Sequence, residues 1–474
     1  MQSDDSTHRS SPPRTVGGYR ELLAIAVPLV LSSSTQSLMH VVDRIFMTWH
    51  SKEAVAAALP AGILFWSFLS LPLGIVSYTN AFVAQYDGAK QPGRVAAAIW
   101  HAIYVALAFG FALIPFALLA GPLFDLVGHE ASIRTLETEY FVSLSWGAVF
   151  ALLPAALCCF FSGRGRAGIV LAVNATSVVV NAVLDPIFIF GWGPFPELGM
   201  CGAAIATNVA NGFATVCYLA LLMRSEARVT YGFWNHWRFD RRLMGELLRF
   251  GGPSGLQMFV DVAGFTAFIM IVGWIGKHEL AATNIAFNLN NLAFTPVLGL
   301  GVAVSTLVGQ RIGEGRPDIA EMSVRKAFVL AGGGMLLCGG VYVLAPQLLL
   351  APYALRADGE HFSEIRRVVV VLLRFVALYS FFDAMVIVFG SAVRAAGDTT
   401  FSMLATFSCA WGLLVLPTYL TWKIYGPNLF WSWVWCSIYV IVLGFVFQRR
   451  FQSGRWKTMS LVHHTCLPLP ETPL

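Results

Sequence analysis

The residues best suited to chemistry are a few acids and amides that interrupt long apolar stretches. Asn181 and Asp185 are the polar positions in the otherwise apolar run from Val178 to Phe190. Because they are four residues apart, they share one face of a helix. A carboxylate in such surroundings is costly unless it is paired, protonated or wetted by a cavity. In a soluble protein a satisfied buried Asp is the simpler interpretation, whereas in a membrane such a residue indicates a functional site.

A second acid, Asp43, lies in the first long apolar stretch. It either forms a local ion pair with Arg44 or faces Asp185 as a second carboxylate. Two close carboxylates cannot both ionise at low cost, so one would hold a proton or the two would bind a cation. Thr207 would add a hydroxyl oxygen, and Pro28 offers a bend point because it removes one helical hydrogen bond.

The second half of the chain carries a comparable set of polar residues, spaced by about one or two helical turns: Gln257 with Asp261, Asn284 with Asn288 and Asn291, and Tyr379 with Asp383. The asparagines form one polar stripe, which predicts either hydrogen bonds between helices or a functional surface. For Asp261 and Asp383, the cost of placing a carboxylate in a membrane span and the isolation of each acid among apolar residues favour a functional role.

Motifs for enzymatic chemistry do not occur in the sequence. It has no Ser/His/Asp array, HExxH, P-loop or dinucleotide fingerprint, and its eight cysteines lack metal-ligand spacing. We therefore expect no enzyme, no ATP drive and no cofactor other than a coupling ion.

Composition places these residues in a membrane protein. Hydrophobic residues make up 57% of the chain and charged residues 12%, and the mean hydropathy is +0.68. That is too little polar surface for two or three soluble domains. The apolar stretches predict an all-α polytopic membrane protein with twelve transmembrane helices: 20–49, 57–85, 95–120, 135–162, 167–191, 199–223, 245–275, 280–310, 322–350, 367–393, 400–422 and 427–448.

The loop charges predict the orientation. With the N-terminus, the even-to-odd loops and the C-terminus on one side, that side holds 22 of the 31 Lys and Arg residues, the other side holds 8, and Arg44 lies within the first span. The positive-inside rule then places both termini in the cytoplasm, with the protein in the inner membrane. The net charge of +5 fits this rule and does not indicate nucleic-acid binding. The polar N-terminal tail resembles no signal peptide.

The two halves of the chain repeat each other. With a shift of 225 residues, Pro28 falls on Pro253, Gln85 on Gln310 and Gly88 on Gly313, among other matches over about 70 residues. Six spans separate the copies, so both halves have the same orientation. We expect two six-helix bundles related by a pseudo-twofold axis, which rock about a midplane site, with Pro28 and Pro253 as hinges. The expected divisions are a disordered tail (1–19), an N-lobe (20–223), a cytoplasmic linker (224–249), a C-lobe (250–448) and a C-terminal tail (449–474).

Over essentially all of residues 18–450 the chain resembles bacterial members of the multidrug and toxic compound extrusion (MATE) family. The motifs that carry this resemblance are Val42-Asp43, 85–89 (QYDGA), Asn181 to Asp185, Leu198 to Thr207, Gly252-Pro253 followed by Asp261, 308–313 (VGQRIG), Tyr379 to Asp383 and Arg394 to Thr399.

The resemblance implies export of cationic and amphipathic compounds in exchange for Na⁺ or H⁺, through a V-shaped cavity between two lobes. It implies an N-lobe cation site, with Na⁺ as the candidate metal, at Asp43, Asn181, Asp185 and Thr207. It also implies C-lobe positions for substrate or cation at Asp261 and Asp383, with Tyr379 one turn before the latter; Gln257, Asn284 and Asn288 join this set by their spacing. The chain departs from the family at Asp261, where many relatives carry Glu, and at Arg44, where a small hydroxyl residue is common.

Three hypotheses follow. The first is a secondary antiporter, expected to be a monomer in contact with membrane lipid and small-molecule substrates. The second is a lipid-linked glycan flippase of the same superfamily, although a flippase cavity would be more basic. The third is a membrane scaffold or receptor, which would not need acids within its spans. Acids among the spans are better suited to cationic substrates, and acids in both lobes leave the choice of coupling site open.

Overall fold

The computed structural model describes residues 17–462 except 118–119, 128–130 and 355–358, and it contains helices and no strands within that part of the chain. The expected tails at 1–16 and 463–474 lie outside the described residues. The N-lobe comprises α1 (Tyr19–His50), α2 (Lys52–Gly88), α3 (Pro92–Ala117), α4 (Ala120–Val127), α5 (Ala131–Trp146), α6 (Ala148–Ser162), α7 (Ala167–Phe190) and α8 (Gly199–Leu222).

The linker and the C-lobe follow. The linker contains α9 (Ser225–Thr230) and a short 3₁₀ turn, η1 (Phe233–Asn235). The C-lobe comprises α10 (Arg241–Ile275), α11 (Lys277–Gly313), α12 (Pro317–Leu344), α13 (Pro346–Ala354), α14 (Gly359–Ala395), α15 (Thr399–Cys409), the π-helical stretch η2 (Ala410–Val415), α16 (Leu416–Tyr425), α17 (Leu429–Gln452) and the 3₁₀ turn η3 (Arg455–Thr458). Helix α10 thus begins four residues before the expected seventh span, which shortens the connection between the lobes.

The number of spans agrees with the prediction. Eleven helices of the described chain are long and apolar enough to cross a membrane, and a pair of helices bent by 42°, Ile133–Trp146 with Ala148–Ser162, makes up to twelve. The expected continuous span 135–162 is therefore broken. The break is at Gly147, where a side chain would collide with Asn208 of α8. Hydropathy alone cannot reveal such a contact.

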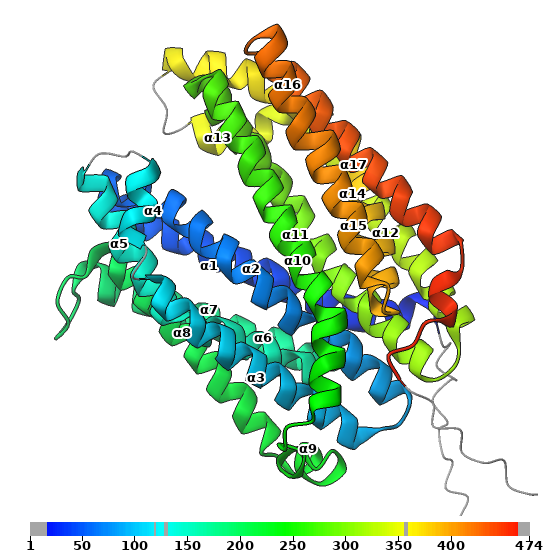
Figure 1. Ribbon diagram of the computed structural model, residues 1–474. Helices are drawn as coiled ribbons and strands as arrows, with labels where there is room; N and C mark the ends of the chain where they lie inside the picture. Colours follow the sequence, from blue (N-terminus) through cyan, green and yellow to red (C-terminus); the bar gives the residue numbers. More distant parts are fainter. Residues whose placement is uncertain (1–16, 118–119, 128–130, 355–358, 463–474) are drawn as a thin grey trace, which may run out of the picture.

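Two bundles of helices meet at one end of the molecule and diverge at the other (Figure 1). Within the N-lobe the main packing partners are α7 with α1 and α8, followed by α3 with α6, and within the C-lobe they are α14 with α11, α12 and α17. Between the lobes, α2 packs on α10 and α11, and α1 packs on α11. The lobes meet at the end where α9 and η3 lie, and they are apart around α4 and α13 (Figure 1).

The contact between the lobes is pseudo-symmetric, as the sequence repeat requires. A Cβ atom on Gly74 of α2 would lie 2.6 Å from the Cα of Gly255 in α10, and one on Gly299 of α11 would lie 2.7 Å from the Cα of Val30 in α1. Gly299 is 225 residues after Gly74, and Gly255 is 225 residues after Val30. These two contacts are therefore equivalent, and each needs a glycine because backbones pass too closely for a side chain.

The ends of α2 and α11 repeat this reciprocity. A Cβ on Gly88 would lie 2.1 Å from the carbonyl oxygen of Gln310, and one on Gly313 would lie 2.1 Å from that of Gln85. The side chains are reciprocal too: Gln85 Nε2 donates to the carbonyl oxygen of Ala395 (2.7 Å), and Gln310 Nε2 donates to that of Gly163 (3.2 Å). The pseudo-twofold axis thus runs between α2 and α11.

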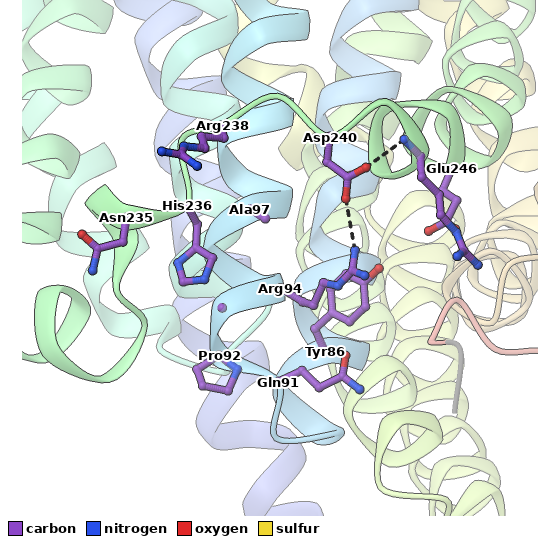
Figure 2. Close-up of a pocket in the computed structure, with 12 residues that line it drawn as sticks. Tyr86, Gln91, Pro92, Arg94, Ala97, Asn235, His236, Arg238, Asp240 and Glu246 are labelled. Atoms are coloured by element: carbon purple, nitrogen blue, oxygen red, sulfur yellow. Dashed lines mark hydrogen bonds and ion pairs between the residues drawn. The ribbon is translucent and has the colours of Figure 1, made fainter. Parts of the chain in front are cut away.

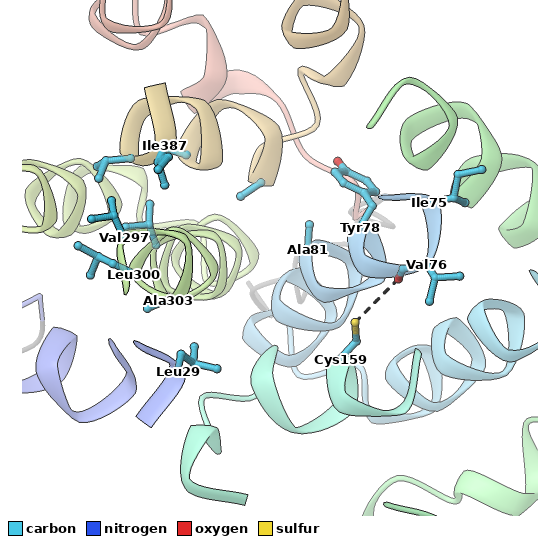
Figure 3. Close-up of a cluster of buried hydrophobic side chains, with 14 of the residues drawn as sticks. Leu29, Ile75, Val76, Tyr78, Ala81, Cys159, Val297, Leu300, Ala303 and Ile387 are labelled. Atoms are coloured by element: carbon cyan, nitrogen blue, oxygen red, sulfur yellow. Dashed lines mark hydrogen bonds between the residues drawn. The ribbon is translucent and has the colours of Figure 1, made fainter. Parts of the chain in front are cut away.

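Apolar side chains from both lobes fill the space beside this axis. Leu29 of α1, Val76 of α2, Leu300 of α11 and Ile387 of α14 belong to one buried cluster, and Cys159 of α6 donates from its thiol to the carbonyl oxygen of Val76 (Figure 3). Burial on both sides makes this end of the molecule a continuous core rather than a surface contact.

The chain after α17 adds a further connection between the lobes. Trp456 of η3 is buried and stacks on Phe451, with ring centroids 5.1 Å apart. Beyond it, the backbone N–H of Leu461 donates to Oε1 of Gln85 in α2 (2.7 Å). We call residues 453–462 the C-terminal strap. This part of the expected tail packs against the N-lobe as well as the C-lobe.

Candidate ion and substrate sites

Three N-lobe helices bring the predicted residues together. Asp43 comes from α1, Asn181 and Asp185 come from α7, and Thr207 comes from α8. Asn181 and Asp185 are fully buried, and Asp43 is 7% exposed. Thr207 Oγ1 donates to Asp43 Oδ2 (3.5 Å), Asn181 Nδ2 donates to Asp185 Oδ1 (3.3 Å), and the two carboxyl groups interact directly.

The donor set of this N-lobe cluster suits a proton or a small hard cation. Three buried oxygens have no hydrogen-bond partner among the described residues: Asp43 Oδ1, Asn181 Oδ1 and Asp185 Oδ2. A pair of buried carboxylates repels itself unless a proton or cation lies between them. Carboxylate, amide and hydroxyl oxygens are also the ligands that hard cations prefer. No cluster of three or more His, Cys, Asp or Glu side chains able to hold a metal is found in the described part of the chain.

Arg44 does not neutralise this cluster. Its side chain is exposed, while that of its neighbour Asp43 is buried, and no ion pair links the two among the described residues. The local pair considered from the sequence is therefore not formed, because the two side chains project from different faces of α1. Tyr140 of α5, which the sequence did not single out, interacts electrostatically with both Asp43 and Asp185.

A second group of hydrogen-bonded polar side chains is centred on Asn174 of α7. Asn174 Nδ2 donates to Ser32 Oγ of α1 (2.8 Å), and Tyr218 of α8 donates from its hydroxyl to Asn174 Oδ1 (3.1 Å). Asn174 precedes Asn181 by seven residues, about two turns, and thus lies on the same face of α7. That spacing was a signal the sequence analysis missed.

The C-lobe acids have different surroundings. Asp261 of α10 is partly buried, and it interacts with the Tyr439 hydroxyl of α17 and with the Arg394 guanidinium at the end of α14. Asp383 of α14 is 8% exposed, and Tyr379, one turn before it, is 2% exposed. Tyr439 interacts with both acids. The C-lobe therefore holds two carboxylates that both interact with one tyrosine.

The amides of the C-lobe occupy two environments. Gln257 of α10 is buried, and its Oε1 has no hydrogen-bond partner. Asn284 and Asn288 of α11 have exposed side chains, so they do not hold helices together. One turn beyond this stripe, Thr295 Oγ1 donates to the Asn291 carbonyl oxygen (2.9 Å) and accepts from Ser37 Oγ of α1 (3.3 Å). The asparagine stripe thus runs toward the N-lobe.

The two prolines expected to act as hinges lie where the lobes touch. Helix α1 continues through Pro28 and helix α10 continues through Pro253. Each proline is followed by one of the close backbone contacts between lobes, Val30 with Gly299 and Gly255 with Gly74. A missing helical hydrogen bond at these points lowers the cost of bending there.

Two repeats of membrane-length helices, joined at one end and carrying buried acids along their length, define a membrane transporter of the paired-bundle type. The model of the MatE family matches residues 28–187 and 253–420. The chain belongs to this family, the MATE transporters.

Known proteins agree with this assignment. The chain is 30% identical over 414 residues to a protein named "Probable multidrug resistance protein NorM" from Burkholderia mallei, covering 85% of this chain and 86% of that protein. It is 24% identical to the NorM of Thermotoga maritima, with 94% of each chain covered. Among solved structures, the outward-facing conformation of a multidrug resistance MATE family transporter has a TM-score of 0.81 at 20% identity, covering 92% of this chain and 96% of that one. The eukaryotic MATE transporter AtDTX14 has a TM-score of 0.82 at 19% identity, with the same coverage.

Proposed function

We propose that this protein is a secondary multidrug antiporter that exports organic cations and amphipathic compounds in exchange for H⁺ or Na⁺. The single observation that carries the proposal is the pairing of Asp43 with Asp185, which leaves buried oxygens without partners. Two buried carboxylates that share a proton or a cation have a much lower free energy than two that are both charged and have no bound ion. Occupancy of the pair therefore depends on the ion gradient. The names of the NorM relatives support the multidrug assignment.

The division of labour between the lobes follows from their surroundings. The N-lobe cluster is buried and rich in oxygens, which suits the coupling ion and Na⁺ in particular. In the C-lobe, Asp383 and Tyr379 combine a carboxylate with an aromatic ring, which suits a lipophilic cation. Opening on the side away from α9 would then expose the substrate position, and bending at Pro28 and Pro253 would let the lobes rock.

The orientation in the membrane is part of the proposal. We place both termini and α9 in the cytoplasm, from the 22-to-8 distribution of Lys and Arg. The lobes are packed together on that side, so the described conformation would face outward. A cysteine at the exposed position Asn235, in a variant without the native cysteines, should resist an impermeant thiol reagent in intact cells and react after permeabilisation. Reaction in intact cells would reverse the orientation.

Counterflow in proteoliposomes tests the antiport itself. A preloaded cationic dye should leave the liposomes when either an inward Na⁺ gradient or an inward H⁺ gradient is imposed, and imposing them separately identifies the coupling ion. Dye movement that ignores both gradients would contradict the antiporter assignment. No feature of the described structure favours the flippase alternative, because the charges buried at the candidate sites are mainly carboxylates.

A further inference from the structure

A cavity of about 690 Å³ lies apart from both acid sites, at the end of the molecule near α9 (Figure 2). Its walls come from the end of α2, the first turns of α3, the segment between η1 and α10, and the first turns of α10. It therefore lies between the N-lobe helix α3 and the C-lobe helix α10, where the linker joins the lobes.

The charged side chains that line this cavity are three arginines, Arg94, Arg238 and Arg242, against two acids, Asp240 and Glu246, and His236 lies beside them. The two acids are engaged. Asp240 caps α10 by accepting from the backbone N–H of Arg242 (2.9 Å), and its other carboxylate oxygen lies 3.5 Å from Arg94 Nη1. Glu246 Oε1 lies 3.3 Å from Arg242 Nε.

Arg238 is the cation that remains available. Its side chain is exposed, and no carboxylate of the described residues pairs with it. Figure 2 shows Arg238 and His236 to the left of Arg94 and Asp240, with the Arg238 side chain extending away from that pair. His236 lies against the backbone of Gly93, in the first turn of α3, so the positive end of that helix also borders the cavity. The cavity thus offers a net positive charge and a guanidinium that pairs with no carboxylate in the described part of the chain.

Aromatic side chains beside the cavity place it at the surface of the bilayer. Trp234, Trp237 and Phe239 are 40%, 58% and 58% exposed, and they alternate with the polar residues of the same segment. The segment is fixed to α3, because Trp100 Nε1 donates to the carbonyl oxygen of Phe233 (2.8 Å) and the Tyr104 hydroxyl donates to that of Trp237. Exposed tryptophans next to arginines at the end of a transmembrane helix are typical of the headgroup region.

We propose that this cavity binds the phosphate-bearing headgroup of an anionic phospholipid. The Arg238 guanidinium would contact the phosphate oxygens, with Arg94 and Arg242 adding long-range attraction, and the acyl chains would lie along Trp237 and Phe239. Basic pockets between transmembrane helices bind such headgroups, and a guanidinium matches the geometry of phosphate oxygens. A lipid held between α3 and α10 would stabilise the contact of the lobes on this side.

Native mass spectrometry of the detergent-solubilised full chain tests the proposal. Phosphatidylglycerol added in steps should give one tight adduct, and phosphatidylcholine should not. Arg238→Gln should weaken that adduct about fivefold, the change that about 1 kcal/mol per surface cation produces. Arg228→Gln, which removes another exposed arginine that lies outside the cavity, should leave it unchanged. Equal adducts in wild type and Arg238→Gln would overturn the proposal.

A second variant separates a lipid from a free anion. Trp237→Ser removes only the side chain, since the hydrogen bond from Tyr104 ends on the Trp237 backbone. This variant should bind phosphatidylglycerol more weakly than the wild type does. The ability of inorganic phosphate to compete with the lipid for the Arg238 guanidinium should be the same in both proteins. Inorganic phosphate that displaces the lipid adduct from the wild type at equal concentration would overturn the lipid assignment and identify a soluble anion instead. These measurements do not depend on transport, so they stand apart from the antiport test.

Discussion

The N-lobe carboxylates interact directly with each other, whereas the C-lobe carboxylates each interact with Tyr439, and Asp261 also interacts with an arginine. Yet α1 and α10, which carry Asp43 and Asp261, occupy equivalent positions in the two halves. The shift of 225 residues that relates the glycine contacts relates Asp43 to Phe268 and Asp261 to Gln36. The duplication therefore kept the backbone contacts between the lobes and let the acids diverge, which is the pattern expected when one lobe couples to an ion and the other meets the substrate.

The largest effect is expected from Asp185→Asn. The substitution keeps the size of the side chain and removes one charge of the pair, so the site loses its preference for a proton or cation. We expect coupled dye export in proteoliposomes to fall to the level of empty liposomes, with the protein still folded. Glu139→Gln, which neutralises an exposed acid on α5, serves as the control and should transport normally. Full coupled transport by Asp185→Asn would remove the N-lobe cluster from the mechanism.

Gly88→Ala and Gly313→Ala test the symmetric part of the comparison. Each new methyl group would meet a backbone carbonyl of the other lobe at 2.1 Å, so the lobes must separate slightly. We expect each variant to lose about 1 to 3 kcal/mol of stability, as overpacked cores do, measured as melting temperature in detergent. The two losses should be similar. Gly168→Ala, where nothing lies within 4 Å, should not lower the melting temperature. Unequal losses would show that the lobes do not meet symmetrically.

The sequence predicted the membrane spans and the two repeated bundles better than it predicted the residues that surround the acids. Hydropathy and the 225-residue shift predicted the spans and the two bundles, because both depend on patterns along the chain. Tyr140 and Tyr439 were missed, since each becomes a neighbour of the acids only through packing between helices distant in sequence. The break at Gly147 was missed for the same reason. The grouping of Asp43 with Asp185 was predicted because isolated acids in apolar helices have few possible partners.

Asp383→Asn tests the substrate side. If Asp383 contacts a cationic substrate, the variant should bind a cationic dye about tenfold more weakly, which corresponds to about 1.4 kcal/mol. It should bind a neutral dye as the wild type does. The alternative is that Asp383 only holds α14 to its neighbours, in which case the melting temperature would fall and dye affinity would stay the same. Measuring both quantities in detergent separates the two, and a destabilised protein with intact cation affinity would contradict the substrate assignment.

The smallest effect is expected where the C-terminal strap meets α12, a contact present in the C-lobe alone. Lys457 Nζ lies 2.6 Å from Glu321 Oε2 and 3.5 Å from Asp318 Oδ1. The hydrogen bond that Lys457 donates to the Glu321 carboxylate raises the pKa of Lys457. A pKa above its unfolded value means that this stabilisation is present below about pH 10.4 and is lost as the pH rises through the folded-state pKa.

Lys457→Gln should therefore lower the free energy of unfolding by less than about 1 kcal/mol, because the pair is partly exposed. The difference from wild type should stay constant between about pH 6 and 9 and shrink in high salt. Arg455→Gln, which neutralises an exposed arginine in the same turn, should change nothing. A loss for Lys457→Gln that persists unchanged in high salt would mean that the strap is held by the packing of its lysine stem and not by the ion pair. In that case both the contact of the strap with α12 and the contact at Gly88 between the lobes would depend on packing.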